Sequence, residues 1–355
     1  MRSSTADDHL WAVILAGGVG SRFWPVSTPA RPKQLLPLGS ERPLLADTVD
    51  RILPLVPAER LRILTGEHLA APILEIVPEL GRDALLLEPR ARGTAPVLAW
   101  AAVELARLDP DAVMISLHAD HVIAPDSEFR ALLAEVSRRA AVTDRLYTIG
   151  IEPTRPETGY GYIQVGAQLG TAPELYEVTD FVEKPDRDTA QEYLLRGGYL
   201  WNSGIFIWRV RTLIDELRRH TPELGELLPL LEAGEVAEFF EQAPMLSIDE
   251  GLLERSDRVA VARAGFRWDD VGSWDAVART RRADRRGNVV VGDSHLIDCD
   301  GCIAWGEDGS VVVFGARDLV VVQASGITFV APRERTEELK ELLRQLPEPL
   351  LRPED

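Results

Sequence analysis

The sequence predicts an α/β fold with a mostly parallel sheet, followed by a small β-rich module. Two apolar runs, residues 10–16 and 112–117, are typical of strands buried on both faces of a parallel sheet. Segments with apolar residues at helical spacing, such as 44–53 and 129–139, alternate with such strands. The other elements expected in this part are strands at residues 61–65, 84–88 and 146–151 and an Ala-rich helix at residues 94–108.

The composition changes near residue 287, where short β-branched runs begin to alternate with Gly, Asp and Asn turns. This pattern is typical of a small all-β module, either a short solenoid or a sheet packed on the main domain. An amphipathic helix is expected to close the chain at residues 334–346. We therefore expect an α/β domain over residues 8–285 and a β-rich module over residues 286–355.

The composition is that of an ordinary soluble globular protein. The chain has 355 residues, of which 45% are hydrophobic and 27% charged. It contains no run of about 18 apolar residues, so no transmembrane helix is expected. Residues 1–8 are polar and lack the apolar core of a secretory signal. The expected location is the cytoplasm.

The net charge of −18 argues against nucleic acid or an anionic membrane as a general partner. An anionic substrate must then be attracted by local positive charge. Only three of the 39 basic residues are lysines, namely Lys33, Lys184 and Lys340. Lys33 and Lys184 lie in candidate phosphate-binding motifs. The lysine ammonium is a compact charge on a flexible side chain, which the planar guanidinium of arginine cannot replace.

A glycine-rich segment follows the first strand. Three glycines within residues 17–20 allow a tight turn that presents backbone N–H groups to an anion. Arg22, Arg31 and Lys33 follow closely and supply positive charge. The segment is neither a dinucleotide-binding fingerprint, because Phe23 stands where the third glycine would be, nor a P-loop. It is suited to binding a nucleoside triphosphate.

The run from Leu15 to Pro37 resembles the signature of sugar-nucleotide pyrophosphorylases. Its Phe23-Trp24-Pro25 and Pro32-Lys33-Gln34 are similar to the mannose-1-phosphate guanylyltransferase branch of that family. The resemblance implies a Rossmann-like, mixed but mostly parallel nucleotidyltransferase (GT-A-like) domain. It also implies that the nucleotide is bound by Leu15, Ala16, Gly17, Gly18, Gly20, Ser21, Arg22, Lys33, Gly93 and Thr94.

The segment before the Ala-rich helix has two interpretations. Thr94 is a candidate helix cap, and Gly93 leaves room for a flat ligand near the backbone, but a plain strand-to-helix junction explains both. Similar proteins carry Gly-Arg-Asn-Thr-Ala-Pro here, so the resemblance implies a nucleobase site. This chain departs from that pattern at Ala91 and Gly93, which leaves its base selectivity open.

Asp120 follows the strand at residues 112–117, at an edge where open α/β sheets bind ligands. A carboxylate there can hold Mg²⁺ against a triphosphate, although a turn cap is the alternative. The resemblance assigns Asp120 to the metal. The family usually has Leu-Pro-Ala-Asp-His, so His118 is a departure, and we expect His118 and His121 to hydrogen bond or pack rather than bind metal.

Asp269 and Asp270 are adjacent acids beside a glycine, which alone is compatible with a solvated turn. The family pattern Trp-x-Asp-Val-Gly-Ser-Trp selects Asp270 as the second metal carboxylate. Trp268 and Trp274 are expected to pack against other side chains.

Three motifs supply groups suited to a sugar phosphate, at residues 158–164, 178–185 and 199–206. Each is weak alone, and Glu183 with Lys184 is compatible with a surface pair. The resemblance places four residues around the sugar phosphate: Gly161, Glu183, Lys184 and Asn202. Residues 247–250 complete the family pattern, and we assign them no role.

Cys299 and Cys302 form an isolated Cys-Asp-Gly-Cys, which we interpret as a β-turn between two strands rather than a metal or redox site.

The resemblance implies the reaction of GTP with mannose 1-phosphate to give GDP-mannose and diphosphate, with Mg²⁺ as cofactor. Arg22, Lys33 and Asp120 are then the catalytic residues, and Asp120 and Asp270 the metal ligands. Two alternatives stay open: a related enzyme with another base or sugar, such as glucose 1-phosphate with dTTP or ATP, and a regulator that binds a sugar nucleotide without turnover. A homodimer is the one oligomeric assembly that we consider.

Overall fold

The computed structural model describes residues 6–18 and 20–351. The expectation about a secretory segment falls mainly on residues 1–5, which lie outside the described part. Among the helices of the described residues, none is long and apolar enough to cross a membrane.

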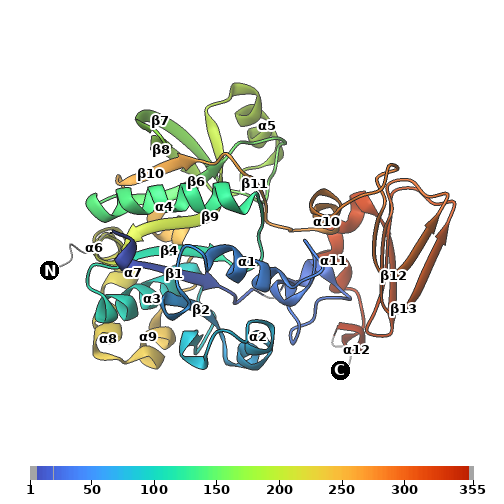
Figure 1. Cartoon of the computed structure of the whole chain (residues 1–355), viewed down its shortest axis with the longest axis horizontal. Helices are drawn as coiled ribbons and strands as arrows, with labels where there is room; N and C mark the ends of the chain where they lie inside the picture. Colours follow the sequence, from blue (N-terminus) through green and yellow to red (C-terminus); the bar gives the residue numbers. More distant parts are fainter. Residues whose placement is uncertain (1–5, 19, 352–355) are drawn as a thin grey trace.

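A nine-stranded mixed sheet forms the centre of the larger domain, in the order β3-β2-β1-β4-β9-β6-β10-β8-β7 (Figure 1). β8 and β9 run against the other strands, so the sheet is mostly parallel, as the sequence predicted. The strands are β1 Leu10–Leu15, β2 Leu61–Gly66, β3 Leu85–Glu88, β4 Val113–His118, β6 Leu146–Ile151, β7 Tyr162–Thr171, β8 Glu174–Val182, β9 Tyr199–Arg209 and β10 Val259–Arg263.

Helices cover both faces of this sheet (Figure 1). One face is covered by α1 (Leu44–Ile52), α2 (Ala70–Ile76) and α4 (Asp126–Val142). The other face is covered by α3 (Thr94–Leu108), α6 (Val210–His220), α8 (Leu228–Ala233) and α9 (Val236–Gln242). The remaining helices of this domain are α5 (Arg187–Arg196), α7 (Pro222–Gly225) and α10 (Trp274–Thr280).

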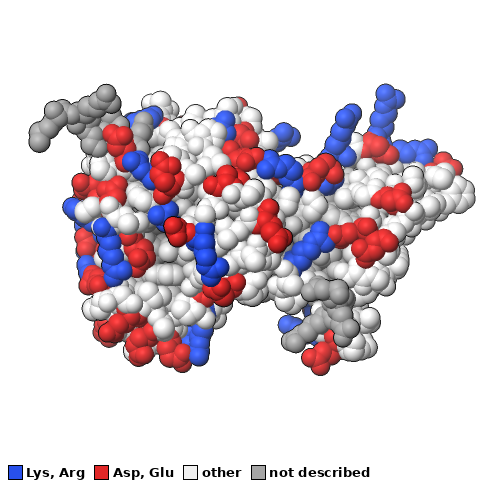
Figure 2. Space-filling view, turned by 60° about the horizontal axis from the view of Figure 1, so that its bottom comes forward, with Lys and Arg blue, Asp and Glu red and all other residues white. Residues whose placement is uncertain are grey.

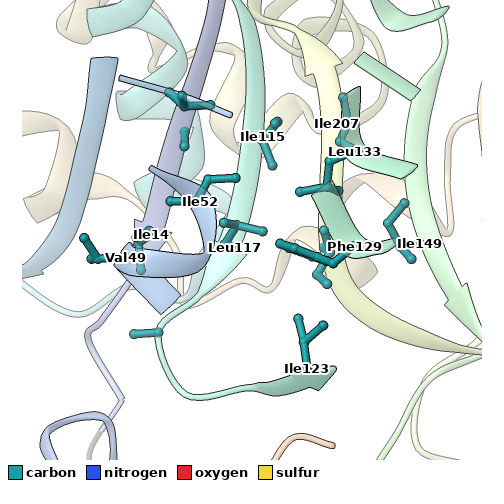
Figure 3. Close-up of a cluster of buried hydrophobic side chains, with 14 of the residues drawn as sticks. Ile14, Val49, Ile52, Ile115, Leu117, Ile123, Phe129, Leu133, Ile149 and Ile207 are labelled. Carbon is teal, nitrogen blue, oxygen red and sulfur yellow. The ribbon is translucent and has the colours of Figure 1, made fainter. Parts of the chain in front are cut away.

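The apolar spacing of the sequence explains how these helices pack. In α4 the buried positions include Phe129, Leu133, Val136 and Ala140, at intervals of three and four residues that form one face of a helix. Figure 3 shows Phe129 and Leu133 of α4 and Ile52 of α1 beside the isoleucines of the central strands. The predicted helices at 44–53, 94–108 and 129–139 are thereby confirmed.

The C-terminal module is a four-stranded sheet of β12 (Val289–Ile297), β13 (Ile303–Phe314), β14 (Leu319–Ala324) and β15 (Ile327–Pro332). The first three strands are parallel, and β15 is antiparallel. One apolar cluster joins this sheet to the segment after the glycine loop, with Phe23 and Trp24 packed among Trp274, Trp305 and Phe329. The buried, unpaired Cys299 and Cys302 lie in the connection between β12 and β13, as expected for a turn.

The predicted closing helix at residues 334–346 is wrong as a single element. Residues Arg333–Glu338 form a 3₁₀-helix, followed by α11 (Leu339–Leu343) and α12 (Glu348–Leu351). Thr336 explains the tighter start, because its hydroxyl donates to the carbonyl of Arg333 at 2.7 Å and competes with α-helical bonding. The domain boundary near residue 285 stays a prediction.

Candidate active site

A short two-stranded ladder brings the two predicted metal carboxylates together. β5 (Val122–Ala124) pairs antiparallel with β11 (Arg267–Asp269), and Val122 lies opposite Asp269. Asp120 precedes β5, and Asp270 follows β11. Both acids therefore stand at the same end of the ladder, beyond the carboxyl end of β4, where ligands of open α/β sheets bind.

Lys33 connects these two residues. Its Nζ donates to Asp120 Oδ2 at 2.8 Å and to the backbone carbonyl of Asp270. The side chain is almost fully buried. Gly20 permits this packing, because it has a φ of +62° and a Cβ there would lie 2.2 Å from the Cβ of Lys33. The glycine loop and Lys33 are thus held together, as the sequence predicted for one site.

The surroundings of Asp120 favour its charged form. Burial alone would raise the pKa of this carboxyl, but Lys33, His121 and His118 outweigh burial and hold the pKa well below its usual range. The carboxylate is therefore ionised at neutral pH.

The neighbouring acids Asp269 and Asp270 have different roles. Asp269 is buried, accepts from Arg279 Nε at 2.9 Å and caps the backbone N–H of Val271 at 2.9 Å. Asp270 instead accepts the hydroxyl of Tyr160 at 2.6 Å. Burial raises the pKa of Asp270, while Lys33 and Tyr160 act to lower it. Burial and Asp270 also raise the pKa of Tyr160, which keeps that hydroxyl a donor.

Arg22 lies beside the same loop. It is exposed, and its Nη1 donates to the carbonyl of Gly272 at 3.3 Å. Among the predicted catalytic residues, Lys33 and Asp120 are in contact. Arg22 contacts neither of them through a hydrogen bond or ion pair among the described residues. The backbone of Ser21 belongs to the same turn, Ser21–Phe23, and its side chain lies outside the described part.

A cavity of about 250 Å³ begins at the carboxyl end of β1. Six of the predicted nucleotide-binding residues line it: Leu15, Ala16, Gly17, Gly18, Gly93 and Thr94. His118, Asp120 and Glu88 also line it, which joins the cavity to the carboxylate ladder. This arrangement suits a nucleobase whose phosphates extend toward Lys33 and Arg22.

Glu88 is the residue of this cavity that sequence reasoning missed. It ends β3, and burial raises its pKa. Among the described residues it has neither an ion pair nor a hydrogen-bond partner for its side chain. Its carboxyl group is thus free to receive donors from a ligand. Its place at the carboxyl end of a strand was the one available signal.

The sequence interpretation of Thr94 as a helix cap needs correction. Thr94 is the first residue of α3, and its hydroxyl accepts the backbone N–H of Ile248 at 2.8 Å instead of capping its own helix. A Cβ on Gly93, which has a φ of +87°, would lie 2.4 Å from the carbonyl oxygen of Leu246. The close approach of Leu246 therefore requires glycine here, and Gly93 also lines the cavity, where room for a flat ligand stays a prediction.

The predicted sugar-phosphate residues lie on β9, just before β7 and just after β8. Asn202 on β9 accepts from the Thr148 hydroxyl at 2.9 Å, and its Nδ2 donates to Asp249 Oδ1 at 2.8 Å. Its backbone N–H bonds to the carbonyl of Gly161 at 2.8 Å. Asn202 and Gly161 are thus adjacent, and the amide of Asn202 has a fixed orientation.

Glu183 and Lys184 form an ion pair in which Lys184 is largely exposed. This pair matches the surface interpretation, but the second oxygen of Glu183 is buried and has no hydrogen-bond partner. A Cβ on Gly161 would lie 2.6 Å from that oxygen, so glycine is needed beside it. The Glu183 carboxylate thus lies against Gly161, next to Asn202.

Asp249 is a second residue that sequence reasoning left without a role. Burial and the nearby Glu183 raise its pKa to about 7, despite the hydrogen bond from Asn202. It belongs to a short π-helical turn, Asp249–Leu253. The sequence shows the motif at residues 247–250, but it does not show that Asp249 contacts Asn202.

His118, Asp120 and His121 each offer one potential ligand atom within 4.8 Å of one another. However, Trp268 Nε1 donates to His121 Nδ1 at 3.1 Å, and the rings of His118 and His121 lie 4.8 Å apart. Because Nδ1 accepts this bond, the neutral ring of His121 carries its proton on Nε2, which leaves no lone pair for a metal. His121 therefore hydrogen bonds and packs, as expected. Trp268 and the fully buried Trp274 pack against other aromatic side chains, also as expected.

Transfer of a nucleotidyl group requires one place for the base, one for the phosphates and one for the acceptor. The fold offers a candidate for each place: the Glu88 cavity, Lys33 with Asp120, and Asn202 beside Gly161. The fold and the site thus define a nucleotidyltransferase.

Comparison with known proteins agrees. Residues 11–287 match the nucleotidyl transferase family, and residues 287–346 match the MannoseP isomerase/GMP-like beta-helix domain. The chain belongs to the nucleotidyl transferase family, and the β-helix match confirms the predicted solenoid-like module.

Two relatives and one solved structure cover most of the chain. The xanthan biosynthesis protein XanB of Xanthomonas campestris pv. campestris (strain B100) is 37% identical over 94% of this chain and 72% of its own length. A mannose-1-phosphate guanylyltransferase of Escherichia coli is 35% identical over 95% of this chain and 74% of its own length. A crystal structure from Thermus thermophilus, described as mannose-1-phosphate geranyltransferase, is 36% identical with a TM-score of 0.87, covering 95% of this chain and 99% of that one.

Proposed function

We propose that the protein transfers the guanylyl group of GTP to mannose 1-phosphate, giving GDP-mannose and diphosphate. The relative from Escherichia coli named mannose-1-phosphate guanylyltransferase supports both substrates. The observation that carries the proposal is the unpartnered carboxyl group of Glu88 in the base cavity. The cytoplasmic location and the homodimer stay predictions from the sequence.

Glu88 favours guanine over the other bases. The edge of guanine presents two adjacent donors, the ring N1–H and the exocyclic amino group, and one carboxylate can accept both. Thymine and uracil present one N–H between two carbonyl oxygens, which a carboxylate repels. Adenine presents its amino group beside a ring nitrogen acceptor. Glu88 is partly buried, and a carboxylate left there without its donors costs free energy, so the other bases are disfavoured.

The proposed reaction is an in-line displacement at the α-phosphorus. An oxygen of the sugar phosphate forms the new P–O bond while the bond to the β-phosphate breaks, and its electron pair leaves with diphosphate. A phosphate monoester has a second pKa of about 6, so the nucleophile is already ionised at pH 7 and no general base is needed. The protein's task is to position the groups and to neutralise charge.

The residues of this chain divide that task. Arg22 and Lys33 neutralise the triphosphate and the leaving group, and Lys184 holds the phosphate of the acceptor. Gly161, Glu183 and Asn202 surround the sugar.

Mg²⁺ is the proposed cofactor, held by Asp120 and Asp270. The donor set fits, because Mg²⁺ prefers one or two carboxylates together with phosphate and water oxygens. The ammonium of Lys33 already lies as a cation against Asp120 and the carbonyl of Asp270. When bound, Mg²⁺ neutralises phosphate oxygens and orients them.

The variant Glu88→Gln tests the base assignment. We expect its kcat/KM for GTP to fall about 10–100-fold, the loss of a charged hydrogen bond, with no fall for dTTP. Steady-state kinetics with each triphosphate varied in turn measures this. Glu67→Gln is the matched control, since Glu67 is an exposed acid paired with Arg82 that lies outside the base cavity. Equal losses for GTP and dTTP would remove Glu88 from base selection.

A further inference from the structure

A second cavity, of about 440 Å³, lies beside Asp270 and is lined by both parts of the chain. Five basic side chains line it: Arg22, Arg155, Arg187, Arg279 and Lys340. Lys340 comes from α11, in the C-terminal segment that follows β15. The cavity therefore joins that segment to the catalytic carboxylate.

Two of the three acidic side chains of this cavity are paired with arginines. Glu157 pairs with Arg155 at 3.1 Å, and Asp275 pairs with both Arg279 and Arg333. Asp270 accepts the hydroxyl of Tyr160.

Three cations of the cavity remain without a carboxylate. Arg22, Arg187 and Lys340 are exposed and form no ion pair with any described side chain. The molecule has a net charge of −18, and its acidic and basic side chains are interspersed over the face in Figure 2. Unpaired positive charge gathered in one cavity favours an anionic ligand.

The fold holds Lys340 in this position. Its neighbour Leu339 is only 2% exposed and belongs to the same apolar cluster as Phe23 and Trp24. α11 also packs against the turn Ser21–Phe23, which carries Arg22. Lys340 is the last of the three lysines of the chain, and the other two already lie at phosphate positions of the proposed site.

We infer that Lys340, together with Arg22 and Arg187, binds the diphosphate that leaves the α-phosphorus. The inference rests on the proposed function only in that the reaction releases diphosphate. As the bond to the β-phosphate breaks, its electron pair adds negative charge to the departing group, which these cations receive. The sugar phosphate offers similar chemistry, but Gly161, Glu183, Lys184 and Asn202 do not line this cavity. The C-terminal module thus contributes to the active site.

Kinetics of the reverse reaction, from GDP-mannose and diphosphate, tests the inference. We expect Lys340→Ala to raise the KM for diphosphate about tenfold, while the KM for GDP-mannose, and the KM for mannose 1-phosphate in the forward reaction, change less than about twofold. Arg187→Ala should have the same effect, and Lys340→Arg should retain most of the affinity. Arg344→Ala is the matched control, because Arg344 is an exposed cation at the end of the same helix that does not line the cavity.

Titration of inorganic diphosphate into the full chain, followed by calorimetry, keeps this inference separate from the choice of base and sugar. We expect weaker binding in Lys340→Ala and unchanged binding in Arg344→Ala, whichever triphosphate the enzyme prefers. An unchanged diphosphate affinity in Lys340→Ala overturns the inference. A raised KM for mannose 1-phosphate with an unchanged KM for diphosphate also overturns it, since the cavity then holds the acceptor.

Discussion

Asp120 and Asp249 are both partly buried carboxyl groups, yet their surroundings act in opposite directions. At Asp120 the cation Lys33 and two histidines outweigh burial and keep the pKa low. At Asp249 the nearby Glu183 adds to burial and raises the pKa to about 7. The neighbours, and not the degree of burial, therefore decide which carboxyl is charged.

This difference separates the two halves of the proposed site. The side that faces the triphosphate has an ionised carboxylate ready to hold a cation. The side proposed for the sugar has Asp249, whose carboxyl group gains or loses a proton near neutral pH. The hydroxyl groups of a sugar can donate to or accept from such a group. One half thus depends on charge, and the other on hydrogen bonding.

The largest expected effect is on the charged half. Asp120→Asn should lower kcat by on the order of 10²-fold or more, because it removes a charge-stabilising group. Turnover at saturating Mg²⁺ measures the loss, and circular dichroism checks that the fold is retained. Asp111→Asn, at an exposed acid before β4, should behave like wild type. Activity close to wild type in Asp120→Asn would contradict the assignment.

A smaller effect is expected on the other half, in the pH dependence of stability. The folded pKa of Asp249, about 7, lies above its ordinary value near 3.8, so the folded state binds the extra proton between these values. The stability contributed by Asp249 is therefore full below about pH 4 and is lost as pH rises toward 7, with a slope of at most about 1.4 kcal/mol per pH unit.

Asp249→Asn removes this contribution. We expect the variant to gain denaturant resistance relative to wild type between pH 5 and pH 8, as measured by urea unfolding midpoints. Asp188→Asn, at an exposed residue of α5, is the control and should show no such change. If the urea midpoints of Asp249→Asn and wild type differ by the same amount at pH 5 and at pH 8, Asp249 does not titrate in this range.

The sequence predicted the features that depend on local pattern. Hydrophobic periodicity identified several strands and the helices at 44–53, 94–108 and 129–139, but it did not predict the break in the closing helix. The motifs identified Lys33 and Asp120, which the fold brings into contact. Features that depend on tertiary neighbours were missed. Glu88 stands out only once its cavity is known, and Asp249 only once Asn202 is placed beside it. Thr94 looked like a helix cap because its distant partner Ile248 is invisible in the sequence.

Diphosphate release, measured with four nucleoside triphosphates against mannose 1-phosphate and glucose 1-phosphate, tests the central claim most directly. The proposed function predicts the highest kcat/KM for GTP with mannose 1-phosphate, and activity that requires Mg²⁺. Faster turnover of dTTP or ATP, or of glucose 1-phosphate, would contradict the proposed substrates, and the absence of turnover with every pair would contradict the proposed enzyme.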